Sequence, residues 1–284
     1  MITRRSVLRW LLGLPLLSLF PFSITRVSSQ SSLPIQGHAK ASIGELFAGE
    51  ELHYEIAFWL IRKVALAKLS FHRGERKGLY TVTLEGETLG VFGFLARYRI
   101  DSYRAVVEEV DEGRRLRSLS FEEYVKVGKK VRKNIHTFDH EGRKWTHRTV
   151  RASGADSSVT KDIPQGKHYD DFLTTAYNFR YGVYGGVERG KNYNLPTFPR
   201  KEVDTYVVKV ASKEEEELTR KSESPQDGSE YCIVLTLDPE VINSKEGAIE
   251  GWLAKELYPV EGTIKDVILF GDVHGSLVKR IKPS

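Results

Sequence analysis

Cysteine is almost absent from this chain of 284 residues, since Cys232 is the only one. A single cysteine cannot form an intramolecular disulfide, a cysteine-rich metal site or the ligand set of an iron–sulfur cluster. Its distance from the amino terminus also excludes lipid attachment to an amino-terminal cysteine. In the stretch EYCIVLTLD it alternates with Tyr231 and Ile233, which indicates a small strand residue rather than a nucleophile.

Motifs of common enzymes are also missing. The sequence has no Gly-x-Ser-x-Gly motif, which carries the nucleophile of many serine hydrolases. The glycine-rich stretch YGVYGGVERG lacks the spaced glycines of a dinucleotide-binding loop and precedes no predicted helix. We therefore expect no cofactor, and the sequence favours a non-enzymatic protein.

Excess positive charge is confined to the amino terminus. The net charge is +5, from 43 basic and 38 acidic residues, but residues 1–30 hold four arginines and no acid, so 39 basic residues remain beyond them. A nearly neutral remainder predicts no nucleic-acid partner. The basic run KVGKKVRKN (residues 126–134) could touch phosphate or acidic lipid head groups, but it lacks interleaved aromatics, and a solvated hairpin face is favoured.

The first residues have the pattern of an export signal. The segment MITRRSVLRWLLGLPLLSLFPFSITRVSSQSS has a basic start with Arg4 and Arg5, an apolar run broken by Pro15 and Pro21, and small residues after it. The run is too short and interrupted for a membrane span. We predict a twin-arginine-like signal peptide at residues 1–30, cleaved on export to the periplasm, and a flexible mature amino terminus at residues 31–44. The alternative is an uncleaved anchor.

From Leu52 onward the dominant hydrophobic period is two, as in half-buried strands. The segments LHYEIAFWL, LYTVTLEGE, LRSLSFEEYVKV and DTYVVKV show it, with Leu119, Phe121 and Val125 in one phase of the third. Short turns rich in Gly and Asp separate the strands, which favours successive hairpins. We predict a mainly β fold: a curved antiparallel sheet or half-barrel with one short helix packed on it, as a single domain over residues 45–281.

The helix is predicted in HYDDFLTTAYNFRYGVYGG, where Asp170 or Asp171 can cap the start and Gly182 can end it. Residues 151–166, which are polar and aperiodic, are interpreted as a long connection. The segment KEEEELTRK is interpreted as a charged hairpin or edge strand.

Two groups of residues could bind metal. Gly271-Asp272-Val273-His274-Gly275 resembles the first metal loop of phosphoesterases, but the other ligand loops of such a site are missing. A turn at Asp272 before a last strand from Val273 to Ile281 is therefore favoured. His136, His140 and His147 could converge on zinc around a hairpin, although a solvated tip is favoured and no metal site is predicted.

Aromatic residues on alternating strand faces and on the helix are the most distinctive remaining feature. They could line a concave apolar pocket under the helix or fill a core, and the filled core is the commoner outcome. The pocket candidates are Tyr54, Phe58, Phe94, Tyr98, Phe121, Phe172 and Tyr177.

Four stretches in order carry a family resemblance: FAGEELHYEIAFWLIRKVALAKLSF, YRIDSYRAVVEE, DDFLTTAYNFR and GWLAKELYPVEGTIKDVILFGDVHGSLV. They resemble the bacterial envelope family catalogued as domain of unknown function 3108, over roughly residues 45–280. The resemblance implies an exported β-rich domain with no established activity, akin to the half-barrels of periplasmic lipoprotein carriers. Lys255, where such proteins often place an acid, and the missing Pro near the helix start depart from the family pattern.

The leading hypothesis is an exported, non-enzymatic envelope protein that binds an apolar or amphipathic molecule such as a lipid, or acts as a scaffold for a partner the sequence does not specify. Contact with a membrane surface fits the same hypothesis. The rival is a hydrolase or metalloenzyme using His136, His140 and His147, or Asp272 and His274. A third alternative is a structural module without a ligand.

Overall fold

One antiparallel sheet of 14 strands makes up most of the chain that the computed structural model describes. The described residues are 41–58, 61–151, 156–200, 203–237, 239, 244–267 and 271–282. The predicted signal peptide with Arg4 and Arg5, and residues 31–40 after it, lie outside them.

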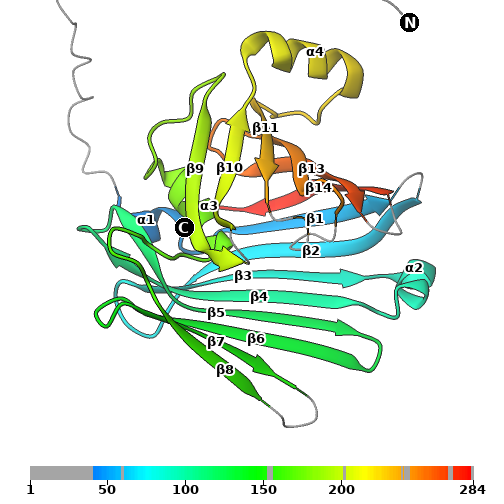
Figure 1. The fold of residues 1–284 in the computed structure, drawn as a ribbon. Coiled ribbons are helices and arrows are strands. Elements are labelled where there is room, and N and C mark those ends of the chain that lie inside the picture. The colour runs from blue at the N-terminus through cyan, green and yellow to red at the C-terminus, as the bar shows by residue number, and fades with distance from the viewer. Residues whose placement is uncertain are drawn as a thin grey trace, which may run out of the picture. The chain divides into compact units, whose positions relative to one another are not determined.

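The strands follow one another along the chain with short turns or helices between them (Figure 1). They are β1 (Glu51–Phe58), β2 (Ile61–Arg73), β3 (Leu79–Thr88), β4 (Ile100–Val110), β5 (Arg115–Val127), β6 (Lys130–Asp139), β7 (Lys144–Val150), β8 (Ser157–Asp162), β9 (Asn192–Arg200), β10 (Val203–Val210), β11 (Tyr231–Thr236), β12 (Ala248–Leu253), β13 (Pro259–Val267) and β14 (Gly271–Ile281). The helices in the described chain are α1 (Ile43–Phe47), α2 (Gly90–Leu95), α3 (Phe172–Tyr181) and α4 (Lys213–Glu223).

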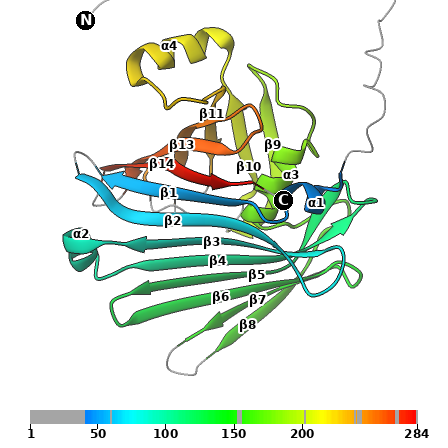
Figure 2. The same cartoon turned by 180° about the vertical axis from the view of Figure 1, so that it is seen from behind.

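The strand order is β8-β7-β6-β5-β4-β3-β2-β1-β14-β13-β12-β11-β10-β9, so the sheet is open with β8 and β9 at its edges. The sheet curves strongly, as both views of the ribbon show (Figure 2). Phe198 of β9 lies 4.4 Å from His136 of β6 and 5.7 Å from Trp145 of β7, measured between ring centroids, although these strands are at opposite ends of the order. The predicted curved antiparallel sheet is confirmed.

Period-two burial follows the predicted strands closely. In β10, Tyr206, Val208 and Val210 are buried, while their neighbours are half-buried or exposed. In β5 a bulge interrupts the period, because Val106 pairs with Ser120 and Val107 with Ser118, which leaves Leu119 as the extra residue. Leu119 therefore does not share the face of Phe121, as the sequence pattern had predicted.

The predicted helix is confirmed as α3, and its contacts explain where it docks. The side chain of Asp171 accepts hydrogen bonds from the backbone N–H groups of Leu173 and Thr174, and Gly182 ends the helix with a left-handed φ of 90°. Strand β6 pairs with residues 120–127 of β5, so the start of β5 has no strand partner on that side. Side chains of α3 and of the residues just before it form hydrogen bonds with the backbone there. Asn178 pairs with both backbone groups of Leu116, at 2.8 and 2.9 Å.

Three further helices, α1, α2 and α4, and one strand, β8, were not predicted from the sequence. The segment KEEEELTRK is not a strand but helix α4, which a capping box between Ser212 and Glu215 starts. Its acidic first turn and basic last turn match the helix dipole. Within the predicted connection at 151–166, β8 pairs with β7 as a fully exposed edge strand. Ile43 of the predicted flexible segment is fully buried in α1.

A buried ion pair joins α3 to the middle of the sheet, where the first strand, β1, lies beside the last, β14. The carboxylate of Glu50, next to β1, accepts two hydrogen bonds from the Arg180 guanidinium of α3, at 2.6 and 2.9 Å. Arg280 of β14 donates to the same carboxylate at 3.3 Å, and the Tyr177 hydroxyl lies 3.4 Å from it. Because the Glu50 and Arg180 side chains are 1% and 4% exposed, each depends on the other for its charge to be stable in the interior.

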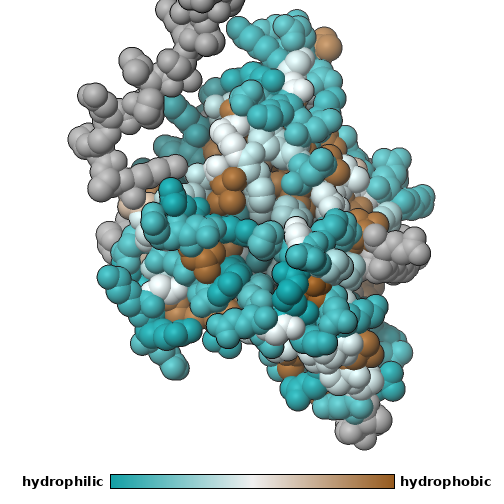
Figure 3. Space-filling view, turned by 60° about the vertical axis from the view of Figure 1, so that its left-hand side comes forward, coloured by the Kyte–Doolittle hydropathy of each residue, from teal (hydrophilic) through white to brown (hydrophobic). Residues whose placement is uncertain are grey.

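The surface drawn in Figure 3 is mostly hydrophilic, with small separate hydrophobic patches. Among the described residues, no helix is long and apolar enough to cross a membrane.

Candidate ligand-binding cavity

A cavity of about 990 Å³ lies inside the curved sheet, and every strand of the sheet contributes at least one residue to its lining. Helix α3 contributes Phe172, Ala176 and Phe179 to the same lining. The cavity exists because α3 fills only one end of the space that the curved strands enclose. Its volume is at the upper end of the range of about 300–1,000 Å³ usual for ligand pockets.

One wall of the cavity is aliphatic. It is formed by the inward-facing residues of four consecutive neighbours in the sheet, β11 to β14. These side chains are half-buried rather than buried, although they point to the inside of the sheet. They are Ile233, Leu235, Ile249, Ile264 and Val273. An interior aliphatic face without full packing is a surface that an apolar ligand can cover.

The facing wall, on β5 to β7, is polar. The Asn134 amide donates to the Glu123 carboxylate at 3.0 Å and accepts from the Thr149 hydroxyl at 3.1 Å. Arg132 lies in the same wall. Glu123 is 6% exposed, so this carboxylate is held inside the protein by hydrogen bonding.

Two histidines lie in register in the polar wall. His136 of β6 pairs with His147 of β7, and their rings stack with centroids 4.5 Å apart. Trp145 donates its indole N–H to Nδ1 of His136 at 3.2 Å. Burial lowers the pKa of His136 to about 4. Burial also lowers the pKa of His147, as do Lys161 and, when it is protonated, His136. Both imidazoles are therefore neutral at pH 7 and present hydrogen-bonding groups without charge.

Of the seven predicted pocket residues, the cavity lining includes Phe172. Phe121 and Tyr177 are fully buried in the core that packs α3 on β2 to β5. The Tyr54 hydroxyl donates to the Pro259 carbonyl at 2.9 Å, and burial raises the pKa of this phenol. These rings fill space next to the cavity rather than line it.

The other three predicted residues lie near one end of the strands. Phe58 contacts Phe92 of α2 with ring centroids 5.6 Å apart. Phe94, on α2, and Tyr98, just after it, are 69% and 59% exposed to solvent. The structure does not bring these residues together with Phe172.

The histidines proposed for zinc do not converge. His140 is not part of the stacked pair: its Nε2 lies 2.6 Å from the Ser118 carbonyl oxygen, and its ring stacks on Phe138. Within the described ranges, no group of three or more His, Cys, Asp or Glu side chains could hold a metal ion.

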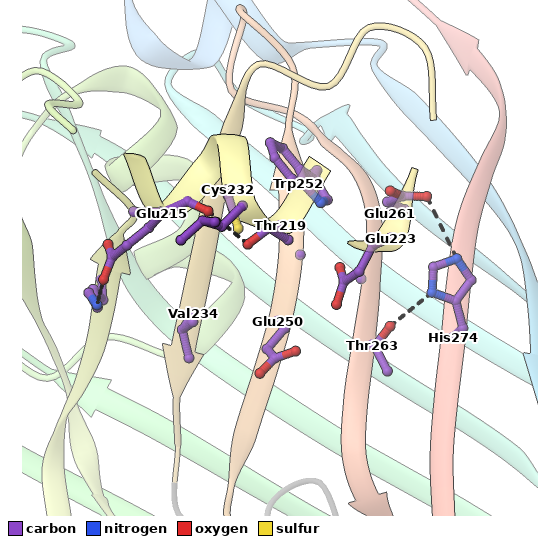
Figure 4. Close-up of a pocket in the computed structure, with 15 residues that line it drawn as sticks. Glu215, Thr219, Glu223, Cys232, Val234, Glu250, Trp252, Glu261, Thr263 and His274 are labelled. Carbon is purple, nitrogen blue, oxygen red and sulfur yellow. Dashed lines mark hydrogen bonds and ion pairs between the residues drawn. The ribbon is translucent and has the colours of Figure 1, made fainter. Parts of the chain in front are cut away.

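His274 lines a recess of about 400 Å³ on the outer face of the sheet, beneath α4 (Figure 4). Asp272 lies two residues earlier on β14, and hence on the same face. His274 contacts the Thr263 hydroxyl at 2.9 Å and the Glu261 carboxylate at 3.7 Å. Asp272 accepts a hydrogen bond from the backbone N–H of Asp266 at 3.1 Å. These contacts hold the β13–β14 hairpin. The predicted last strand is present, but it starts at Gly271, so Asp272 lies within β14 rather than in the predicted turn before Val273.

The aliphatic wall was missed by sequence reasoning. Its residues alternate with Cys232 and Val234 on β11 and with Glu250 and Trp252 on β12, so the period-two signal was present. That signal predicts an inward face but does not tell a packed face from an open one.

The fold and the cavity together define a structural class: an open, curved antiparallel sheet that encloses an amphipathic cavity. The model of the family described as "Protein of unknown function (DUF3108)" matches residues 53–277, and the chain belongs to that family. The resemblance drawn from the sequence is thereby confirmed.

Two solved structures match the chain at low sequence identity. One is the β-barrel-like protein of domain of unknown function DUF1849 from Brucella abortus, with 10% identity and a TM-score of 0.45, covering 83% of this chain and 98% of that one. The other is a DUF1089 family protein from Pseudomonas aeruginosa, with 12% identity and a TM-score of 0.26, covering 73% and 87%. No curated protein matches the chain.

Proposed function

We propose that this protein binds one amphipathic molecule, such as a lipid, in the cavity of the curved sheet. The hydrocarbon part lies against the aliphatic wall of β11 to β14, and the polar part faces the wall of β5 to β7. The observation that carries the proposal is the open aliphatic wall, whose interior side chains stay half-buried beside a volume of about 990 Å³.

The energetics favour an occupant with a long apolar part. Covering apolar surface contributes about 25 cal/mol per Å², so a ligand hydrocarbon chain that buries about 300 Å² gains about 7.5 kcal/mol before the entropy of binding is subtracted. The polar wall adds selectivity, because Asn134 and the neutral His136 and His147 reward hydrogen-bonding groups. A purely apolar ligand would gain nothing from the polar groups of this wall.

We also propose that the protein is exported to the cell envelope, where such a ligand is abundant. The support is the sequence of residues 1–30, with Arg4 and Arg5 before an apolar run. A scaffold role without a ligand leaves the open wall unexplained.

Thermal unfolding with added oleate or lysophosphatidylethanolamine tests the binding. A ligand at a hundredfold excess over its Kd stabilises by about 2.7 kcal/mol, which raises the Tm by about 5–10 °C in a domain of this size. Leu235→Trp places an indole in the cavity and is expected to abolish the shift. Val234→Trp, on the opposite face of the same strand, is the matched control and is expected to keep it. Equal shifts in both variants, or none in the wild type, would contradict the proposal.

Export is tested by cell fractionation of the full chain. Arg4→Lys together with Arg5→Lys is expected to leave an unprocessed protein in the cytoplasm, because the twin-arginine pathway requires the pair. Arg9→Lys is the control and is expected to behave as the wild type. A doubly substituted protein of mature size in the periplasm would exclude that route.

A further inference from the structure

We propose that one end of the sheet docks onto an anionic membrane surface. This end, called the α2 tip, consists of α2 with Arg97 and Tyr98, the start of β2, the start of β4 and the β5–β6 hairpin. Seven of the thirteen exposed large hydrophobic side chains of the described residues lie there. They are Ile61, Val91, Phe94, Leu95, Tyr98, Ile100 and Val131.

The exposed side chains of α2 face solvent although the helix itself is fixed in place. Val91, Phe94 and Leu95 are 79%, 69% and 72% exposed. Phe92 and Gly93 point inward, where Phe92 contacts Phe58 and Gly93 is buried. The backbone N–H of Leu89 donates to the Val64 carbonyl at 2.8 Å, which ties the helix start to β2. In Figure 1, α2 projects from the end of the strands.

The turn after α2 has a strained backbone, and hydrogen bonds that hold the turn also fix the position of the helix. Arg97 and Tyr98 have φ values of 58° and 49°, a left-handed conformation that is unfavourable for side chains of this size. Hydrogen bonds hold it: the Tyr98 N–H donates to the Gly93 carbonyl at 2.5 Å, and the Gly128 N–H donates to the Arg97 carbonyl at 2.8 Å. The second bond joins α2 to the β5–β6 hairpin.

Basic residues predominate around the apolar side chains of the α2 tip, and Glu87 at the end of β3 is an exposed acid beside them. Arg62, Arg97, Lys129 and Lys130 are exposed there. Lys63 is exposed too but pairs with Glu55 at 2.8 Å, and Arg99 pairs with Asp101 at 2.7 Å. Apolar side chains ringed by basic ones match a bilayer surface that carries negative head groups, since the rings enter the interface and the cations meet phosphate.

The cavity reaches the same end of the sheet. Glu87 and Thr88 at the end of β3, and Arg99 just before β4, flank α2 and also line the cavity. A membrane at the α2 tip would therefore lie next to one end of the cavity.

Site-specific labelling of the full chain tests docking independently of the ligand and of residues 1–40. Cys232 is buried, and burial raises the pKa of its thiol to about 11, so a thiol-reactive, environment-sensitive fluorophore at neutral pH labels an introduced cysteine selectively. Val91→Cys reports the α2 tip. Leu218→Cys on α4, where the native side chain is 66% exposed, is the matched control.

With vesicles of phosphatidylethanolamine and phosphatidylglycerol, we expect a blue shift of the fluorophore at position 91 and none at 218. Phe94→Ser with Leu95→Ser is expected to weaken vesicle binding about tenfold or more, because both side chains lose their burial in the interface. Lys129→Ala with Lys130→Ala is expected to weaken it about thirtyfold. Lys221→Ala, on α4, is expected to change nothing.

Three results would overturn the proposal. The first is the absence of a shift at position 91 with these vesicles. The second is an equal shift with vesicles of phosphatidylcholine alone, which would remove the role of charge. The third is a shift without vesicles that grows with protein concentration, which would assign the α2 tip to contact between copies of this chain.

Discussion

Neutralising Glu50 is expected to destabilise the protein strongly, because this carboxylate is the shared partner of two arginines from α3 and β14. Glu50→Gln keeps the size of the side chain but leaves the Arg180 guanidinium, 4% exposed, without a counter-charge. Removing one partner of a buried ion pair costs about 3–5 kcal/mol. For a domain of this size the Tm should fall by about 6–20 °C.

The neighbouring contacts predict an order of effects. Arg280→Met should cost less than Glu50→Gln, since Arg280 is 17% exposed, lies 3.3 Å from Glu50 and leaves the Glu50–Arg180 pair intact. Urea unfolding of the two variants, and of Glu50→Leu with Arg180→Met, measures these costs. The double variant should recover part of the loss, because the buried Arg180 charge is removed together with its partner, while Arg280 keeps a contact with Glu256 at 4.0 Å. A loss below about 1 kcal/mol for Glu50→Gln would refute the reasoning.

Two further predictions concern α3 and the histidine pair. Asp171→Ala should lower the free energy of unfolding, measured in urea, by about 2–4 kcal/mol. It removes the cap of α3 and the hydrogen bond from the Ser118 hydroxyl at 2.7 Å. A loss as small as that of Asp156→Ala, at an exposed site, would contradict this prediction. His136 has a pKa of about 4 in the folded protein and about 6.5 when unfolded, so the unfolded chain binds more protons between these values. The free energy of unfolding should therefore fall by up to about 3 kcal/mol as the pH drops from 6.5 toward 4. The fall should be smaller in the His136→Gln variant. If the wild type and this variant showed the same pH dependence of unfolding, the low pKa of His136 would be contradicted.

The strands and α3 could be predicted because their signals are local. Tyr206, Val208 and Val210 alternate with polar neighbours, and α3 has both a capping acid and a terminal glycine. Helix α4 was missed since its apolar content is low, although Ser212 and Glu215 form a capping box that could be read in the sequence. Strand β8 has no buried face and hence no alternation to detect.

The cavity could not be predicted in the same way. Whether Leu235 and Ile249 pack against other side chains or face open space depends on how far the sheet curves and on where α3 docks. Docking depends in turn on pairings such as that of Asn178 with Leu116, which are 62 residues apart in sequence. Such long-range contacts leave no periodic signal.

The most direct test of the central claim is the ligand content of the protein as cells make it. The full chain and its Leu235→Trp and Val234→Trp variants would be purified without detergent and analysed by native mass spectrometry, followed by solvent extraction. We predict about one amphipathic molecule per chain in the wild type and in Val234→Trp, and none in Leu235→Trp. A wild-type protein without any bound molecule, or the same content in all three proteins, would contradict the account.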